Sequence, residues 1–168
     1  MCSSDLFADA AARTMADWRA AMAGNLNSGA SPIYPDRICH EITRALPHDG
    51  ILVADTGYSS IWTSTLVELN GAGQTYLRAA GSLGWSFPAA LGAKCAAPHR
   101  KVICWSGDGA LYYHLTELET AKRRGIAVVL LVNNNSGFGQ GWPNIQRQQG
   151  NKPGDVAELV RFGPTNFA

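Results

Sequence analysis

Three short runs of apolar residues limit the folds that this chain can adopt. They cover residues 51–54, 102–105 and 126–132, and none of them alternates between apolar and polar side chains. A strand that is apolar on both sides has to be covered on both faces, as in a parallel sheet flanked by helices. Helix-like patterns separate the runs, so strands and helices alternate along the chain. The sequence therefore predicts an α/β fold with three layers, in which a mainly parallel sheet has helices on both faces.

The segments around these runs carry further helix and strand signals. Residues 75–80 have the pattern of another strand, and helices are expected over residues 6–22, 35–46, 85–97 and 115–125. In the last helix, Leu111, Leu115 and Leu118 are expected to share the inward face, and Gly125 to end the helix. Residues 1–31 are an Ala-rich arm followed by a linker.

The composition excludes some classes of partner. The 168 residues carry a formal net charge of +1, and the only basic run, Lys122–Arg124, has the pattern of a solvated helix end. Nothing therefore points to nucleic acid or to a membrane surface as a partner. No apolar run is long enough to cross a bilayer. The four cysteines lack zinc-site spacing, so we expect reduced thiols and a cytoplasmic protein.

A carboxylate and a block of carboxamides follow two successive apolar runs. Asp108 stands between two glycines shortly after residues 102–105, and three asparagines, 133–135, follow residues 126–132. The two groups are one strand–helix–strand crossover apart, and a right-handed crossover brings both strand ends to the same edge of the sheet. Because ligands bind at the carboxyl edge of such sheets, we expect Asp108 and Asn135 to converge there.

Oxygen atoms that converge in this way suit a hard cation and a phosphate. Asp108 offers an anionic oxygen, Asn135 an amide oxygen and Gly137 a backbone carbonyl, which are ligand types that Mg²⁺ accepts. A helix that begins after Gly109 would direct free N–H groups at a phosphate, and Gly107 leaves room for it. The sequence therefore predicts a site for a metal-bound diphosphate. Each half of the pattern alone is usually a turn or loop, and the chain has neither a Walker phosphate loop nor a complete G-x-G-x-x-G fingerprint.

Three blocks of sequence carry a resemblance to a known family. They are the G-D-G and N-N pair, the segment AAGSLGWSFPAALGAK (79–94) and the segment ILVADTGYSSIW (51–62). Together they resemble the C-terminal cofactor-binding domain of thiamine diphosphate-dependent enzymes, in the group of acetolactate synthase, benzoylformate decarboxylase and pyruvate decarboxylase. The resemblance covers about residues 32–145. It implies thiamine diphosphate and Mg²⁺ as cofactors.

The resemblance implies a role for each matching residue. Asp108 and Asn135 are implied to bind Mg²⁺ through their side chains, and Gly137 through its carbonyl. Gly81 is implied to accept a hydrogen bond from the 4′-amino group of the cofactor, and Leu83 to wedge the cofactor into a bent shape, so these two are the catalytic candidates. Without the resemblance, Leu83 would be taken for an ordinary core residue. The residues implied to contact the cofactor are Thr56, Gly57, Tyr58, Ser59, Gly81, Ser82, Leu83, Gly107, Asp108, Gly109, Ala110 and Asn135.

The same resemblance implies a parent enzyme that joins or decarboxylates 2-oxo acids, with acetolactate synthase-like chemistry as the first expectation. A benzoylformate decarboxylase-like or aldehyde lyase-like enzyme is the alternative. A non-catalytic cofactor-binding fragment and a nucleotide-binding regulator are rival hypotheses of other classes. The chain departs from the family at Ala110, where many relatives have a serine. Residues 138–149 match neither the acetolactate synthase nor the pyruvate decarboxylase pattern, so the substrate stays open.

In the family, a glutamate that protonates the cofactor lies on a pyrimidine-binding domain, usually of a neighbouring subunit, and it has no counterpart here. We therefore expect residues 1–31 to be an arm from a missing preceding domain. Residues 32–168 are expected to be the cofactor-binding domain, truncated at its C-terminus. The isolated chain is expected to be inactive, and the parent enzyme to be a homodimer or homotetramer that uses this pyrimidine-binding domain as partner.

Overall fold

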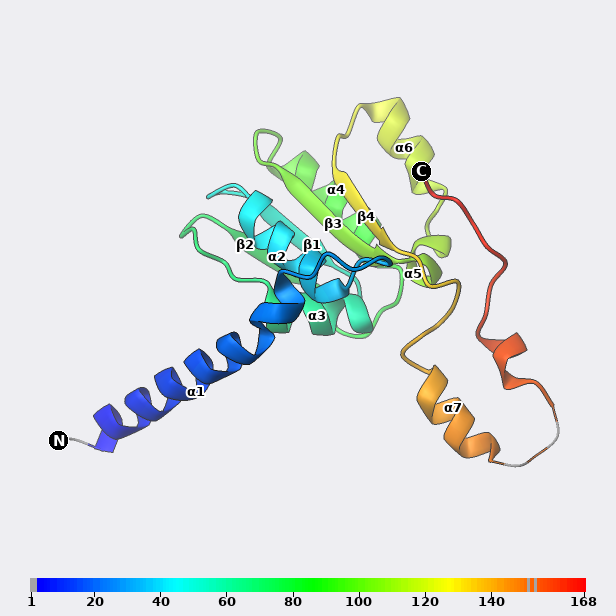
Figure 1. Ribbon diagram of the computed structural model, residues 1–168. Helices are drawn as coiled ribbons and strands as arrows, with labels where there is room; N and C mark the ends of the chain where they lie inside the picture. The colour runs from blue at the N-terminus through cyan, green and yellow to red at the C-terminus, as the bar shows by residue number, and fades with distance from the viewer. Residues whose placement is uncertain (1–2, 151, 153) are drawn as a thin grey trace.

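A sheet of four parallel strands forms the centre of the computed structural model, which describes residues 3–150, 152 and 154–168 (Figure 1). The strands are β1 (Ile51–Ala54), β2 (Thr75–Arg78), β3 (Val102–Gly107) and β4 (Val129–Asn133). Their order across the sheet is β2-β1-β3-β4, and each neighbouring pair is parallel. The expected α/β fold is confirmed.

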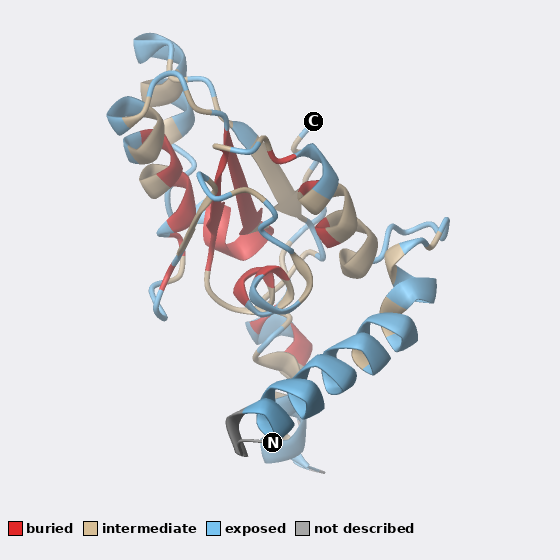
Figure 2. Ribbon diagram, turned by 90° about the vertical axis from the view of Figure 1, so that its left-hand side faces the viewer, coloured by how far each residue is buried: buried red, intermediate tan, exposed pale blue. Residues whose placement is uncertain are grey.

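Helices flank both faces of this sheet (Figure 1). In chain order they are α1 (Ser3–Leu26), α2 (Pro35–Ala45), α3 (Tyr58–Leu66), α4 (Ser86–Ala96), α5 (Asp108–Tyr112), α6 (Glu117–Arg124), α7 (Trp142–Gln149) and the short 3₁₀ helix η1 (Val156–Leu159). On one face, α2 and α3 pack around Leu52 and Trp105, and on the other, α4 packs around Val53 and Cys104. Strand side chains alternate between the two faces, so buried residues lie on both sides of the sheet (Figure 2).

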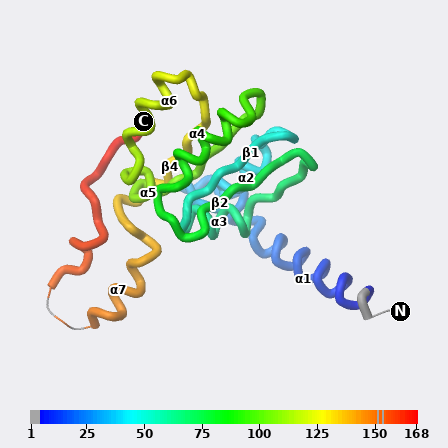
Figure 3. The backbone as a smooth tube through the Cα atoms, turned by 180° about the vertical axis from the view of Figure 1, so that it is seen from behind, coloured from blue at the N-terminus to red at the C-terminus, as the bar shows by residue number. Residues whose placement is uncertain are grey.

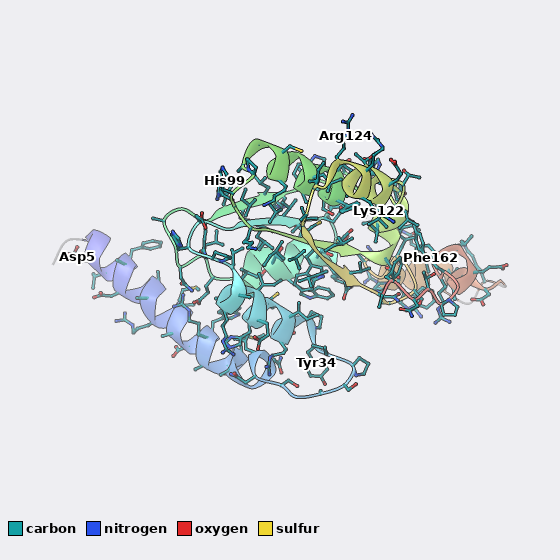
Figure 4. The ribbon with its side chains drawn as sticks, turned by 90° about the horizontal axis from the view of Figure 1, so that it is seen from above. Asp5, Tyr34, His99, Lys122, Arg124 and Phe162 are labelled. Atoms are coloured by element: carbon teal, nitrogen blue, oxygen red, sulfur yellow. The ribbon has the colours of Figure 1, made fainter. Side chains whose placement is uncertain are left out.

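The surface helix α6 follows the signals in its sequence. Gly125 ends the helix in the left-handed conformation, with a φ of 65°. Glu119 forms an ion pair with Arg123 one helical turn away, with 2.6 Å between the Nε and Oε1 atoms. Lys122 and Arg124 are exposed and project from α6 (Figure 4). The basic run is thus the solvated helix end that the sequence indicated.

The predicted inward face around α6 is only partly correct. Leu111 lies in α5 and is buried, but Leu115 and Leu118 are 38% and 45% exposed, so the prediction is wrong for these two. The turn between α5 and α6 contains backbone hydrogen bonds between residues three apart, from His114 N–H to Leu111 O and from Glu117 N–H to His114 O. A turn with about three residues instead of about 3.6 shifts the helical phase, so the leucine spacing no longer marks one face.

The segment after β1 forms α3, which is not among the helices expected from the sequence. It is rich in serine, threonine and aromatic residues, which are weak helix formers. The Trp62 ring stacks on Tyr58, with 5.1 Å between the ring centroids, and on Trp105 of β3 at 5.9 Å. Packing against the sheet therefore overrides the local preference of the segment.

The helix α1 extends away from the sheet as an arm (Figures 1 and 3). It is longer than the predicted helix over residues 6–22, and its described side chains are mostly exposed. Asp5 lies at the far end of the arm (Figure 4), and Arg19 pairs with Glu68 nearer the sheet, at 2.8 Å. Neither α1 nor another helix in the described part of the chain has both the length and the apolar character to span a membrane.

Candidate functional site

A cavity of about 240 Å³ opens at the carboxyl edge of the sheet. Segments that follow all four strands line it: residues 56–59 after β1, Leu83 after β2, residues 107–110 after β3, and residues of the 133–141 loop after β4. The connection after β1 covers one face of the sheet, and the connection after the neighbouring β3 covers the other. Ligands bind at such switch points because the two connections diverge and leave a crevice.

Asp108 and Asn135 converge on one backbone N–H group inside this cavity. Asp108 is 2% exposed, and its Oδ1 accepts a hydrogen bond from Gly109 N–H at 2.8 Å. Its Oδ2 accepts from Gly137 N–H at 3.2 Å, and Oδ1 of Asn135 accepts from the same N–H group, also at 3.2 Å. The two side chains that the sequence placed at neighbouring strand ends therefore lie together.

The charge of Asp108 has no ion-pair partner among the side chains that the structure describes. A buried carboxylate without a counter-charge favours a bound cation. Across residues 3–150, 152 and 154–168, no three His, Cys, Asp or Glu side chains cluster as metal ligands. Asn135, which shares the Gly137 N–H group with Asp108, offers a neutral amide oxygen. The carbonyl of Gly137 is a further neutral oxygen of the cavity wall, and it accepts one bond from Gly139 N–H at 3.0 Å. This donor set fits a hard cation such as Mg²⁺.

The loop after β1 forms a second wall of the cavity. Thr56, Gly57, Tyr58 and Ser59, which the resemblance implies as cofactor contacts, all line it. Gly57 has a φ of 76°, a conformation that favours glycine, and turns the chain from the strand into α3. A Cβ atom at Gly57 would lie 3.2 Å from Oε1 of Gln140, in the loop after β4. The first and last loops therefore face each other across the cavity.

The loop after β2 carries three residues that the resemblance implies as cofactor contacts, and one of them lines the cavity. Leu83 lines the cavity, but Gly81 and Ser82 do not, and both are exposed. Gly81 has a φ of 112° and lies in the turn that leads to Leu83. Of the three residues in this loop, only Leu83 is therefore in contact with the cavity in this structure.

Asp55 is a site residue that the sequence reasoning missed. It is fully buried at the end of β1, and its carboxylate accepts three backbone N–H groups. Its Oδ1 accepts from Thr56 at 2.9 Å and from Gly84 at 3.0 Å, and its Oδ2 accepts from Ser86 at 2.8 Å. The only signal in the sequence was an acidic residue after an apolar run, which is also common in turns.

The C-terminal tail, residues 160–168, supports the loop after β4. Phe138 N–H donates to Val160 O, and Phe162 N–H donates to Ser136 O, both at 2.8 Å. The rings of Phe138 and Phe162 meet edge to face, with 4.7 Å between their centroids. Ser136 has a φ of 56°, which is unusual for a residue with a side chain. Phe138 also lines the cavity, and no pattern in the sequence marked it.

The described cysteines are free thiols, as expected, while Cys2 lies outside the described residues. Burial raises the pKa of Cys104 to about 12; the Ser86 side chain lowers it by a smaller amount, and the charge of Asp55 raises it further. Burial likewise raises the pKa of Cys39 to about 12, with a further rise from Asp36. Neither thiol is therefore a nucleophile near neutral pH.

A family model described as "Thiamine pyrophosphate enzyme, C-terminal TPP binding domain" matches residues 55–168, which is more than half of the chain. The chain belongs to the thiamine pyrophosphate enzymes. The resemblance that the sequence motifs carried is thereby confirmed. The matched region contains all the residues that line the cavity.

The names of the curated relatives of this chain state several different activities. Acetolactate synthase isozyme 1 large subunit of Escherichia coli (strain K12) is 32% identical over 103 residues, covering 61% of this chain and 18% of the relative. Benzoylformate decarboxylase of Pseudomonas aeruginosa is 32% identical over 108 residues, covering 64% and 20%. Sulfoacetaldehyde acetyltransferase of Castellaniella defragrans is 30% identical over 118 residues, covering 64% and 18%. The chain spans about a fifth of the length of these relatives.

Proposed function

We propose that this chain binds thiamine diphosphate through Mg²⁺, as the cofactor-binding domain of an enzyme that joins or decarboxylates 2-oxo acids. The observation that carries the proposal is the convergence of Asp108 and Asn135, from the ends of neighbouring strands, at the wall of a cavity. Family membership names the cofactor, and the convergence supports the position of its charged end.

The proposed cation ligands are the side chains of Asp108 and Asn135 and the carbonyl of Gly137. Asp108 supplies the negative charge, and the other two supply neutral oxygens, while water and the diphosphate complete the coordination of Mg²⁺. The backbone N–H group of Ala110 faces the diphosphate in this proposal, whereas that of Gly109 donates to Oδ1 of Asp108. Ala110 has no hydroxyl group, so it can contribute only through its backbone.

The loops after β1 and β2 form the rest of the proposed cofactor site. Residues 56–59 would hold the diphosphate, and Gly81, Ser82 and Leu83 would hold the rings of the cofactor. Thiamine diphosphate, when bound, supplies a nucleophilic carbon and accepts the electrons released on bond cleavage. The contribution of this chain is to hold the charged end and to orient the rings.

The names of the relatives support the reaction class. Acetolactate synthase and benzoylformate decarboxylase are equally identical to this chain, at 32%. Carboligation of 2-oxo acids is our first proposal, because several relatives are acetolactate synthases. Decarboxylation or aldehyde lyase chemistry is the second, because the decarboxylase is equally similar.

A second polypeptide segment is part of the proposal. Asp108 is the only acidic side chain among the described residues that line the cavity, and we assign it to the cation. The acid that protonates the pyrimidine ring therefore has to come from outside this cavity wall. We propose that it belongs to a pyrimidine-binding domain of the same or a neighbouring subunit, in a homodimer or homotetramer.

Calorimetric titration of the chain with thiamine diphosphate, ATP and NAD, each with Mg²⁺, tests the proposed function. We expect thiamine diphosphate to bind, removal of Mg²⁺ by a chelator to abolish the binding, and the two nucleotides to bind at least about tenfold more weakly. Tighter binding of ATP than of thiamine diphosphate would identify a nucleotide-binding regulator. Absence of thiamine diphosphate binding would contradict the proposal.

A further inference from the structure

We propose that Asp55 is a positioning residue that aligns the loop of residues 79–86, and through it Leu83, with the bound cofactor. This inference rests on the proposed function, because it takes the cofactor to lie in the cavity that Leu83 lines. Asp55 does not itself line the cavity. It acts through the backbone of the loops that do.

The burial of Asp55 makes its hydrogen bonds hard to replace. Its side chain has no ion-pair partner among the described residues, and it is 0% exposed. A charged group in such a place is stable only when it is fully hydrogen-bonded, and bonds to a carboxylate are about twice as strong as neutral ones. Gly84 and Ser86 are also buried, so their N–H groups would lose their acceptor together with the carboxylate. The backbone from Gly84 to Ser86 is therefore held in place by the Asp55 carboxylate.

Gly84 is fixed from its other side as well. It has a φ of 90°, and a Cβ atom there would lie 2.6 Å from the Cβ atom of Tyr113 and 3.1 Å from Ala110 O. The backbone of Gly84 is thus wedged between the Asp55 carboxylate and the short helix that follows β3. Because Leu83 is the preceding residue, its position depends on this contact.

The hydrogen bonds of Asp55 connect segments that line the cavity. The carboxylate joins Thr56, in the loop after β1, to Gly84, in the loop after β2. Gln74 makes the same number of bonds at the opposite edge of the sheet. Its Oε1 accepts from Gly71 N–H at 2.9 Å, and its Nε2 donates to the carbonyls of residues 46 and 47 at 3.0 Å. Gln74 therefore offers a matched control that is remote from the cavity.

The test compares Asp55→Asn with Gln74→Met, using two probes: thiamine diphosphate with Mg²⁺, and inorganic pyrophosphate with Mg²⁺. Pyrophosphate needs only the cation and diphosphate part of the site, whereas thiamine diphosphate also needs the loop that carries Leu83. In Asp55→Asn, the amide oxygen can keep the hydrogen bonds from Thr56 and Gly84, while the NH₂ group faces the N–H donor of Ser86. The loop of residues 79–86 therefore shifts, whereas the loop after β1 keeps its contact. We expect the affinity for thiamine diphosphate to fall at least about tenfold. The affinity for pyrophosphate should change less than about twofold.

Gln74→Met should leave the affinity ratio of the two probes as in the wild type, even though it loses three hydrogen bonds. An unchanged ratio in Asp55→Asn, whether both probes weaken equally or neither does, would overturn the role of Asp55. If the wild-type chain bound neither probe, the proposed function itself would be contradicted.

A measurement on the wild type covers the case in which Asp55→Asn does not fold. Amide hydrogen exchange in residues 81–84 should slow when thiamine diphosphate with Mg²⁺ is added, and should stay unchanged with pyrophosphate and Mg²⁺. Exchange that slows equally with both probes, or with neither, would overturn the proposal, because the loop would then not respond to the cofactor rings.

Discussion

Two buried carboxylates at the same edge of the sheet differ in how their charge is balanced. Asp55 accepts three backbone N–H groups at 3.0 Å or less. Asp108 accepts two, and the longer bond, at 3.2 Å, is shared with Asn135. The carboxylate with fewer donors has more capacity left for a cation, because each bonded N–H offsets part of its charge. We therefore assign the cation to Asp108 and the loop contacts to Asp55.

Asp108→Asn should largely abolish Mg²⁺-dependent binding of thiamine diphosphate, with an affinity loss of about hundredfold or more. The substitution removes the single anionic oxygen of the proposed cation site while keeping the shape of the side chain. Calorimetry measures the affinity, and urea unfolding shows whether the fold is retained. Glu119→Gln makes the same charge change on exposed α6 and should bind the cofactor as the wild type does. An unchanged affinity in Asp108→Asn would mean that the cation binds elsewhere.

Cys39 and Cys104 should resist a thiol-alkylating reagent at pH 8, whereas the exposed Cys95 should react. Burial raises both pKa values from 9.0 to about 12, so little thiolate forms in the folded chain. Mass spectrometry of digested peptides measures the modification, and a denatured sample, in which the described cysteines all react, is the control. Rapid alkylation of Cys104 in the folded chain would contradict its burial.

The same raised pKa values give a pH dependence of stability. The folded state holds these two protons more tightly than the unfolded state, so this part of the unfolding free energy is complete below about pH 9. This contribution to stability should be lost as the pH rises from about 9 towards about 12. The reactivity of the two thiols should increase over the same pH range.

At the scale of elements, the segment from α5 to α6 shows how a short turn changes which side chains are buried. Leu111 and Leu118 both belonged to the leucine pattern in the sequence, and the three-residue hydrogen bonds around His114 separate them. Leu111 packs in the core beneath the sheet, and Leu118 is exposed. The element boundary, rather than the residue type, therefore decides how much each leucine contributes to stability.

Leu111→Ala should lower the unfolding free energy by about 2–4 kcal/mol, because it leaves a cavity in a packed core. Leu118→Ala should change it by no more than about 0.5 kcal/mol, because the side chain is largely in water. Urea unfolding measures both values, and the comparison is matched because each variant replaces a leucine by alanine. Equal losses would mean that α5 and α6 form one continuous amphipathic helix.

At the scale of the whole molecule, the chain joins a sheet with a cavity at its carboxyl edge to an exposed arm (Figure 1). The cavity wall that the structure describes contains one carboxylate and no lysine, arginine or histidine. Such a wall can hold a cation and a diphosphate, but it offers no second acid for proton transfer. In our proposal the chain therefore binds the cofactor without completing the reaction.

The chain alone, with pyruvate, thiamine diphosphate and Mg²⁺, should release no carbon dioxide and form no acetolactate above the background of free cofactor. A calorimetric titration of the same sample shows that the cofactor is bound, so a negative result is not due to an empty site. Turnover by this chain alone would show that a residue within it supplies the missing acid, and would contradict the proposed need for a second domain.

The fold class and the pairing of Asp108 with Asn135 were determined by the sequence itself. Apolar runs and strand-end residues are local features, and the handedness of crossovers then brings the strand ends to one edge. The helical state of α3 and the contacts of Asp55 were decided only by the tertiary structure. They depend on neighbours that are distant in the chain, such as Trp105 beneath Trp62 and the N–H groups that surround the Asp55 carboxylate, and no local pattern encodes these contacts.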